Sequence, residues 1–376
     1  QNQAYFDWVA DEFGLRGEIV FETEVKALTW DEQAAEWVID LVGPDGPRTH
    51  RSKAVVTSVG FLNRPNMPTI EGMERFEGPS WHTGRWPEGF DPKGKRFAVI
   101  GTGCTGYQMV PELARDAAHI TVFQRTPQWL MAVPGYLSKV PDQINWLDRN
   151  LPYHSNFMRF RTSFGTSEDW TRMTSVEPGF DDPHSVSPTN KLLRDNSLAY
   201  LKARLGDRRL GDRTLVEIMT PEHPVWSARA VLVDTDYNIL DALMADNVTL
   251  VTHGIARINA TGIEDGASAQ HDVDVIIYAT GFKANEYLYP MEITGRDGVT
   301  ISQLWSKDGA RAYVGGMMPG FPAVFSPILP APTNGHPFPV FAYSGLLPWT
   351  AFAAAVGSAS TSLVAHASLV TRVYFP

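Results

Sequence analysis

The chain has 376 residues, of which 43% are hydrophobic and 11% aromatic, so it is long enough to bury two cores and we expect two domains. Its formal net charge of −10 argues against a nucleic acid or an anionic membrane as a partner. The single cysteine, Cys104, cannot form an intramolecular disulfide, which fits a reducing compartment, so we expect a cytoplasmic protein and assign no metal ligands.

The first part of the chain predicts a small sheet. Alternating residues favour strands at Ile19 to Val25 and at Trp37 to Val42, and the turn residues from Pro44 to Pro47 favour a hairpin. The chain starts with Gln1 and has no basic segment followed by an apolar run. We therefore expect it to begin inside a longer protein and to carry no secretory signal.

An unusual run of aromatic residues follows, FEGPSWHTGRWP. A surface loop that carries these residues by chance is one interpretation, and a structural role is the common one for a histidine such as His82. The spacing FxGxxxHxxxWP is more specific, because it includes the rare residue types His and Trp. The positions that match it are Phe76, Gly78, His82, Trp86 and Pro87.

A strand and a glycine turn come next. The apolar run from Phe97 to Ile100 leads into GTGCTG, and the spacing of apolar residues predicts a helix after it, bent at Pro111. Such glycines allow a tight turn, the approach of a pyrophosphate and close helix packing, and the start of the helix directs free N–H groups at the phosphates. We predict that a dinucleotide binds here, at Gly101, Thr102, Gly103, Cys104, Thr105, Gly106 and Gln108.

These two segments together resemble the Baeyer-Villiger monooxygenases, in which the motif FxGxxxHxxxWP precedes the NADPH-binding turn. The resemblance implies an α/β fold with two dinucleotide-binding, Rossmann-like domains, the NADP domain being inserted in the FAD domain. It implies FAD and NADP as cofactors, and a ketone and molecular oxygen as substrates that give an ester or lactone through a flavin peroxide. It also implies that His82 couples movement of the nicotinamide domain to the flavin and transfers no proton.

A second strand is predicted from His119 to Phe123, and Gln124, Arg125 and Thr126 follow it, where an NAD enzyme would have an acidic residue. An arginine at this place suits a 2′-phosphate. VFQRTP is similar to the NADPH-selecting segment of the family, so the resemblance assigns the 2′-phosphate to Arg125 and Thr126. A solvated arginine at the end of a strand is the alternative.

The stretch from Trp129 to Asp212 is rich in aromatic and basic residues and has helical spacing around Leu192 to Leu205. We interpret it as a helical excursion on the NADP domain. Its aromatic side chains could line a substrate approach, but packing within an amphipathic core is the favoured interpretation. The residues concerned are Trp146, Tyr153, Phe157 and Phe160.

The segment SARAVLVDTDY, which starts at Ser227, is similar to a family segment in which a Lys-Arg pair precedes a strand and an Asp-rich turn. Ala228 stands where the lysine is usual, so one phosphate contact is missing and the preference for NADPH over NADH is expected to be weaker. The resemblance makes Arg229 the catalytic residue, because the family's arginine at that place reaches the flavin and stabilises the peroxide. An ordinary surface arginine is the alternative.

Two strand-and-turn segments lie on either side of this region, VTSVGFLNRPNMP from Val56 to Pro68 and VIIYATGF from Val275 to Phe282. The second contains the ATG sequence found in flavoproteins with two dinucleotide domains, where the backbone changes domain beside the cofactor. We therefore interpret both segments as hinge strands. The resemblance adds Ala279, Thr280 and Gly281 to the cofactor-binding candidates.

The resulting domain assignment is a remnant of the FAD domain at residues 1–65, the NADP domain with its helical insertion at 66–282, and a return to the FAD domain at 283–376. The FAD domain is incomplete in this sequence. The glycine fingerprint that the family uses for FAD does not occur in it, and neither does the acidic partner of the catalytic arginine.

The last part of the chain resembles the flavin domain of the family, nearest to the 4-hydroxyacetophenone monooxygenase branch, and then the likeness fades. Only Pro332, Thr333, Asn334 and Gly335 stand where a turn near the flavin is usual, and no charged residue occurs between Arg311 and Arg372. A buried part of the flavin domain, a membrane-associating segment and a damaged or artificially joined terminus are the three explanations. The polar residues within 346–370 argue against a membrane-associating segment.

The function expected from these features is FAD- and NADPH-dependent oxidation of ketones to esters or lactones. One alternative is a flavin-containing or N-hydroxylating monooxygenase, which oxidises nitrogen or sulfur atoms, but the Trp-Pro ending of the aromatic motif favours the ketone oxidisers. The other alternative is an inactive NADP-binding fragment.

Overall fold

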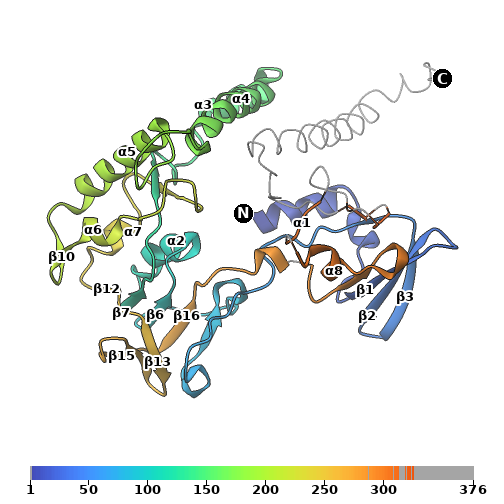
Figure 1. Ribbon diagram of the computed structural model, residues 1–376, viewed down its shortest axis with the longest axis horizontal. Coiled ribbons are helices and arrows are strands. Elements are labelled where there is room, and N and C mark those ends of the chain that lie inside the picture. The colour runs from blue at the N-terminus through green and yellow to red at the C-terminus, as the bar shows by residue number, and fades with distance from the viewer. Residues whose placement is uncertain are drawn as a thin grey trace. The chain divides into compact units, whose positions relative to one another are not determined.

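The computed structural model describes residues 2–286, 288–307, 309–312, 318, 320–322, 324 and 325 (Figure 1). It divides into two compact units, one of Gln1–Phe61 with Asn285–Pro376 and the other of Leu62–Ala284. The tail features predicted at Pro332 to Gly335 and within 346–370 lie outside the described residues. The assignment of flavin and nicotinamide roles to the two units stays a prediction.

The first unit contains a four-stranded mixed sheet in the order β17-β1-β2-β3. The strands are β1 Glu24–Asp31, β2 Glu36–Gly43, β3 Gly46–Ser52 and β17 Glu292–Thr294. Leu28, Trp37 and Ile293 are fully buried in one cluster with Trp305 of α8 Ile301–Trp305. Two short strands, β4 Val55–Val56 and β18 Val324–Phe325, pair in parallel in the same unit, which begins with the helix α1 Asn2–Glu12.

The predicted hairpin is confirmed, and one predicted strand is wrong. β2 and β3 are antiparallel up to the pair Gly43 and Gly46, so Pro44 and Asp45 form the turn. Most of the segment from Ile19 to Val25 is not a strand, because a 3-10 helix, Leu15–Glu18, and a turn with Glu22 at φ 51° precede β1, and only Glu24 and Val25 lie in β1. Its apolar side chains are exposed, so their alternation does not mark the face of a sheet.

The second unit contains a five-stranded, wholly parallel sheet in the order β12-β7-β6-β16-β5, which confirms the predicted α/β fold. The strands are β5 Ser80–His82, β6 Arg96–Ile100, β7 His119–Phe123, β12 Val248–Val251 and β16 Val275–Tyr278. The strands predicted at Phe97 to Ile100 and at His119 to Phe123 are therefore confirmed as β6 and β7. Their apolar runs are continuous because a parallel sheet is covered on both faces.

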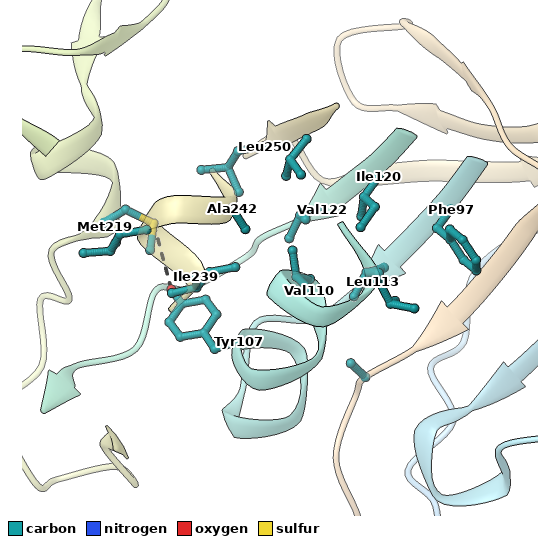
Figure 2. Packing of buried hydrophobic residues seen from close by; sticks show 14 of the residues in the cluster. Phe97, Tyr107, Val110, Leu113, Ile120, Val122, Met219, Ile239, Ala242 and Leu250 are labelled. Carbon is teal, nitrogen blue, oxygen red and sulfur yellow. Dashed lines mark hydrogen bonds between the residues drawn. The ribbon is translucent and has the colours of Figure 1, made fainter. Parts of the chain in front are cut away.

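The helix α2 Cys104–Leu113 follows the glycine turn and packs on this sheet. Figure 2 shows Val110 and Leu113 of α2 beside Ile120 and Val122 of β7, with the side chains of α7 Ile239–Ala242 nearby. Burial of each such side chain contributes about 1.5–3 kcal/mol, so this cluster holds the start of α2 at a defined place beside the strand ends. Pro111 lies in the last turn of the helix, and a bend there stays a prediction.

The excursion after β7 is helical, as predicted. Its elements are β8 Leu130–Val133, α3 Asp142–Asn150, α4 His154–Thr174, α5 Pro188–Leu205 and β9 Arg209–Leu210. Beyond Asp212 follow β10 Arg213–Thr214, α6 Leu215–Met219 and β11 Val231–Asp234. β8 and β11 pair in parallel. A small antiparallel sheet of β13 Ile255–Asn259, β14 Gly262–Asp265 and β15 Gln270–Asp272 precedes β16.

The predicted core packing of the aromatic residues on α3 and α4 is wrong. Trp146, Tyr153, Phe157 and Phe160 have exposed fractions of 61%, 80%, 61% and 63%. Helical spacing shows that apolar side chains share a face, but it does not show whether another element covers that face. Within the described ranges, no helix combines the length and the apolar character that crossing a membrane requires.

Candidate functional site

The glycine turn between β6 and α2 is closely fitted at two positions and open at a third. A Cβ on Gly101, whose φ is 106°, would lie 2.5 Å from the Ala279 carbonyl oxygen, and a Cβ on Gly106 would lie 2.3 Å from the Gly101 carbonyl oxygen. Both positions therefore require glycine. No heavy atom lies within 4 Å of a Cβ built on Gly103, so a ligand can approach the backbone there.

The start of α2 offers free hydrogen-bond donors. Gly103 is the N-cap and supplies no capping side chain, and no acidic residue occupies the first turn. The first intrahelical bond runs from Tyr107 N to Gly103 O, at 3.0 Å. The earlier N–H groups and the positive end of the helix dipole therefore suit a phosphate group.

The segment with Arg125 and Thr126 lies beside this turn, as the prediction requires. Thr102 Oγ1 donates to Thr126 O at 3.1 Å, and Gly101 N donates to Phe123 O, also at 3.1 Å. The Arg125 side chain is exposed and forms no ion pair within the described parts of the chain. A guanidinium with these surroundings is available to a ligand phosphate.

The ATG segment after β16 forms the other wall of the turn. Ala279 N donates to Ile100 O at 2.8 Å, and Ala279 O is the atom that excludes a side chain from Gly101. The other predicted hinge segment, Val56 to Pro68, is hydrogen-bonded to the ATG segment. Asn66 N donates to Gly281 O at 2.9 Å, and Thr280 Oγ1 donates to Asn66 O at 2.6 Å. The two predicted hinge segments therefore lie side by side.

His82 connects the aromatic motif to the ATG segment. Its Nε2 lies 2.7 Å from Gly281 O, and its Nδ1 accepts from Gly84 N at 3.0 Å. Because Nδ1 accepts, the ring is neutral and Nε2 carries the proton that it donates to Gly281. The residue is only 3% exposed, so bulk solvent has little access to the ring.

The other motif residues make packing contacts around β5. Phe76 packs on the cluster that contains Ile258, and a Cβ on Gly78 would lie 2.6 Å from the Asp274 carbonyl oxygen. Trp86 meets Trp81 edge to face at 5.4 Å, and Pro87 is partly buried. These contacts hold the short strand β5 and the following turn, from which His82 projects.

We expect the protein to lose stability below about pH 6.5 in a way that depends on His82. Burial lowers the pKa of His82 from 6.5, the bond to Gly281 opposes this change, and Arg85 lowers the pKa further. As the pH falls below 6.5, the unfolded chain binds a proton at this ring while the folded chain does not, so the free energy of unfolding decreases. Denaturant unfolding at a series of pH values measures this effect.

The control is His82→Gln, whose side chain does not titrate. We expect it to be about 1–3 kcal/mol less stable at neutral pH, because Gly281 O or Gly84 N loses its partner. The difference between the variant and the native protein should then shrink as the pH falls. A difference that stays constant with pH would contradict the neutral-ring interpretation.

Arg229 is exposed in the segment before β11. Among the described residues, no hydrogen bond or ion pair connects its side chain with the glycine turn, so its catalytic role stays a prediction. Thr105 and Gln108 are exposed near the start of α2, while Cys104 is partly buried and packs against the core.

Sequence analysis did not find Tyr107. This residue is 1% exposed in α2, and its hydroxyl meets the side chain of Gln124 at 3.1 Å. A tyrosine among apolar positions of a helix is a weak signal, because only the fold shows whether its hydroxyl has a partner.

Comparisons with known proteins show similarity to flavin-dependent monooxygenases. A family model described as flavin-binding monooxygenase-like matches residues 1–141. The chain is 31% identical to the uncharacterized monooxygenase y4iD of Sinorhizobium fredii over 334 residues, or 88% of this chain and 49% of the relative. It is 31% identical to a Baeyer-Villiger monooxygenase of Pseudomonas aeruginosa over 337 residues, or 89% of this chain and 59% of the relative.

The crystal structure of OTEMO in complex with FAD and NADP matches the fold with a TM-score of 0.68 and 27% identity. The match covers 92% of this chain and 67% of that structure. The chain spans about half the length of the first curated relatives that it matches.

Proposed function

We propose that this chain belongs to the Baeyer-Villiger monooxygenases, the class B flavoprotein monooxygenases, and that its function follows from this family. In the protein that contains it, the chain binds NADPH and takes part with FAD in the oxidation of a ketone to an ester or lactone. The observation that carries this proposal is the glycine turn at the uncapped start of α2, joined to the Arg125 segment by the Thr102–Thr126 hydrogen bond.

The residues of the turn fit a nicotinamide dinucleotide. Gly103 leaves room for the pyrophosphate, and the N–H groups that follow it would donate to the phosphate oxygens. Arg125 and Thr126 would hold the 2′-phosphate, which distinguishes NADP from NAD. Ala228 offers no second cation in the later segment, so we propose a modest preference for NADPH.

The chain contributes binding, orientation and charge to the reaction. FAD, when bound with NADPH and molecular oxygen, supplies the redox chemistry. The ATG segment, Ala279 to Gly281, would contact the cofactor. His82 would hold this segment in place through its hydrogen bond to Gly281. Arg229 would place a fixed positive charge where negative charge develops during the attack on the carbonyl.

The substrates, the cellular location and the branch of the family are also proposals. The substrates are a small ketone and molecular oxygen, and the location is the cytoplasm. The 4-hydroxyacetophenone monooxygenase branch is proposed on sequence likeness alone.

The test is product analysis with the protein that contains this chain, purified and supplied with FAD. We expect NADPH consumption with a cyclic or aryl ketone, and an ester or lactone as the product. An N-oxide or a sulfoxide from an amine or sulfide, without ester from ketones, would instead indicate a flavin-containing or N-hydroxylating monooxygenase. NADPH binding without any product or flavin absorbance would indicate a binding module.

A further inference from the structure

The segment that carries Arg125 is held at its start by a buried glutamine. Gln124 is 4% exposed, and its backbone N donates to Val251 O at 2.8 Å. Its side-chain Nε2 donates to Ile218 O at 3.2 Å, which directs Oε1 toward α2. The side-chain oxygen of Gln124, which is buried, therefore needs a hydrogen-bond donor, and α2 is the element that it faces.

The hydroxyl of Tyr107 provides that donor. It donates to Gln124 Oε1 at 3.1 Å and accepts from Gln128 N at 3.4 Å. The Met219 sulfur also lies within reach, at 3.9 Å (Figure 2), but a thioether is a weak acceptor and the hydroxyl has one proton. Burial raises the pKa of Tyr107, so the hydroxyl stays a donor throughout the physiological pH range.

One side chain of α2 thus contacts the segment on both sides of Arg125. Gln124 precedes Arg125, and Gln128 follows it closely in the chain. Between them, Thr126 O is fixed by Thr102 of the glycine turn at 3.1 Å. The exposed guanidinium therefore projects from a backbone that is tied to the same helix whose start would face the phosphates of a bound nucleotide.

We propose that Tyr107 is a positioning residue for nucleotide selection, because its hydroxyl holds the Arg125 segment where the 2′-phosphate of NADP would bind. This inference rests on the proposed function, since it needs a nicotinamide dinucleotide at the glycine turn. It assigns to Tyr107 no contact with the nucleotide itself. Its effect should therefore be seen in the preference for NADP over NAD.

The test compares the dissociation constants of NADP⁺ and NAD⁺ for the complete protein and for Tyr107→Phe, by calorimetric titration. The phenylalanine keeps the ring and removes the hydroxyl, so Gln124 Oε1 and Gln128 N each lose a partner. We expect NADP⁺ to bind about tenfold more weakly and NAD⁺ to change by less than about twofold, a loss in selectivity of the size of one hydrogen bond to a charged group. Arg125→Ala, which removes the cation, should lower the same selectivity.

The matched control is Tyr237→Phe. The Tyr237 hydroxyl also donates to α2, at Pro111 O and 2.8 Å, but it does not touch the Arg125 segment. Both nucleotides should bind to this variant as they do to the native protein. A folded Tyr107→Phe with unchanged selectivity would overturn the inference and leave the proposed function intact, whereas a native protein that binds neither nucleotide would overturn both.

Loss of folding in Tyr107→Phe would be addressed by the double variant Tyr107→Phe with Gln124→Met. It replaces both partners of the buried hydrogen bond by apolar groups of similar size, which removes the unsatisfied Gln124 oxygen, although Ile218 O then loses the Gln124 amide as a donor. We expect its stability to recover in part, because Ile218 O and Gln128 N still lack these partners, and its selectivity for NADP⁺ to stay low. Native selectivity in this folded variant would overturn the inference.

Discussion

Replacement of Arg229 by alanine is expected to reduce ester formation at least about 100-fold while the protein stays folded. A preorganised donor beside developing negative charge contributes about 2.7–4 kcal/mol to a transition state, which corresponds to a loss of that size or more. The side chain is exposed, so its removal should change the free energy of unfolding by no more than about 0.5 kcal/mol. Ester formation from a ketone at saturating NADPH measures the first effect, and denaturant unfolding measures the second.

The matched control is Arg208→Ala, because Arg208 is also exposed in the same unit and has no proposed role. Its activity should equal that of the native protein. Arg229→Lys keeps the charge without the planar fork of donors, so an intermediate activity is expected. Native turnover in Arg229→Ala would identify Arg229 as an ordinary surface arginine and remove it from the mechanism.

Alanine substitutions at two glycines of the turn are expected to have different effects: Gly106→Ala should lower the free energy of unfolding, and Gly103→Ala should weaken nucleotide binding. Gly106→Ala places a methyl group 2.3 Å from the Gly101 carbonyl oxygen, so the turn must shift, and we expect a loss of about 3 kcal/mol in the free energy of unfolding. Gly103→Ala meets no protein atom within 4 Å. We expect it to stay stable and to bind NADP⁺ at least about tenfold more weakly, because the methyl group occupies the approach of the pyrophosphate.

Denaturant unfolding and titration with NADP⁺ measure the two effects. Gly254→Ala is the control, since a Cβ there also meets no atom within 4 Å and the residue lies in the same unit outside the turn. It should change neither quantity. Native affinity in Gly103→Ala would mean that the pyrophosphate does not approach at this residue, and native stability in Gly106→Ala would mean that the turn is less closely fitted than its geometry indicates.

The fold could be predicted where the local signal was strong. The apolar run before the glycine turn predicted β6, the run after the helix predicted β7, and helical spacing predicted the later part of α5. The failures have one cause. The alternation from Ile19 to Val25 and the aromatic stripe of α3 and α4 are also local patterns, but burial of a side chain depends on elements that are distant in the sequence.

The candidate site shows the same division. The turn and Arg125 could be predicted because glycine spacing and the end of a strand have direct backbone consequences. The bond from His82 to Gly281 could not, since it joins residues 199 positions apart. The hydroxyl of Tyr107 likewise needed the placement of Gln124, which is 17 positions away on another element.

The sequence by itself determined the glycine turn, because Gly101 and Gly106 each answer a steric requirement of the surrounding backbone and Gly103 leaves the backbone open. Only the tertiary structure decided which polar groups meet around that turn, because a hydrogen bond needs its two atoms within about 3.5 Å and the parallel sheet brings them to the same strand ends. The local sequence pattern therefore predicts which chemical groups the site contains. The packing of α2, β7 and β16 determines which side chains hold the turn in place.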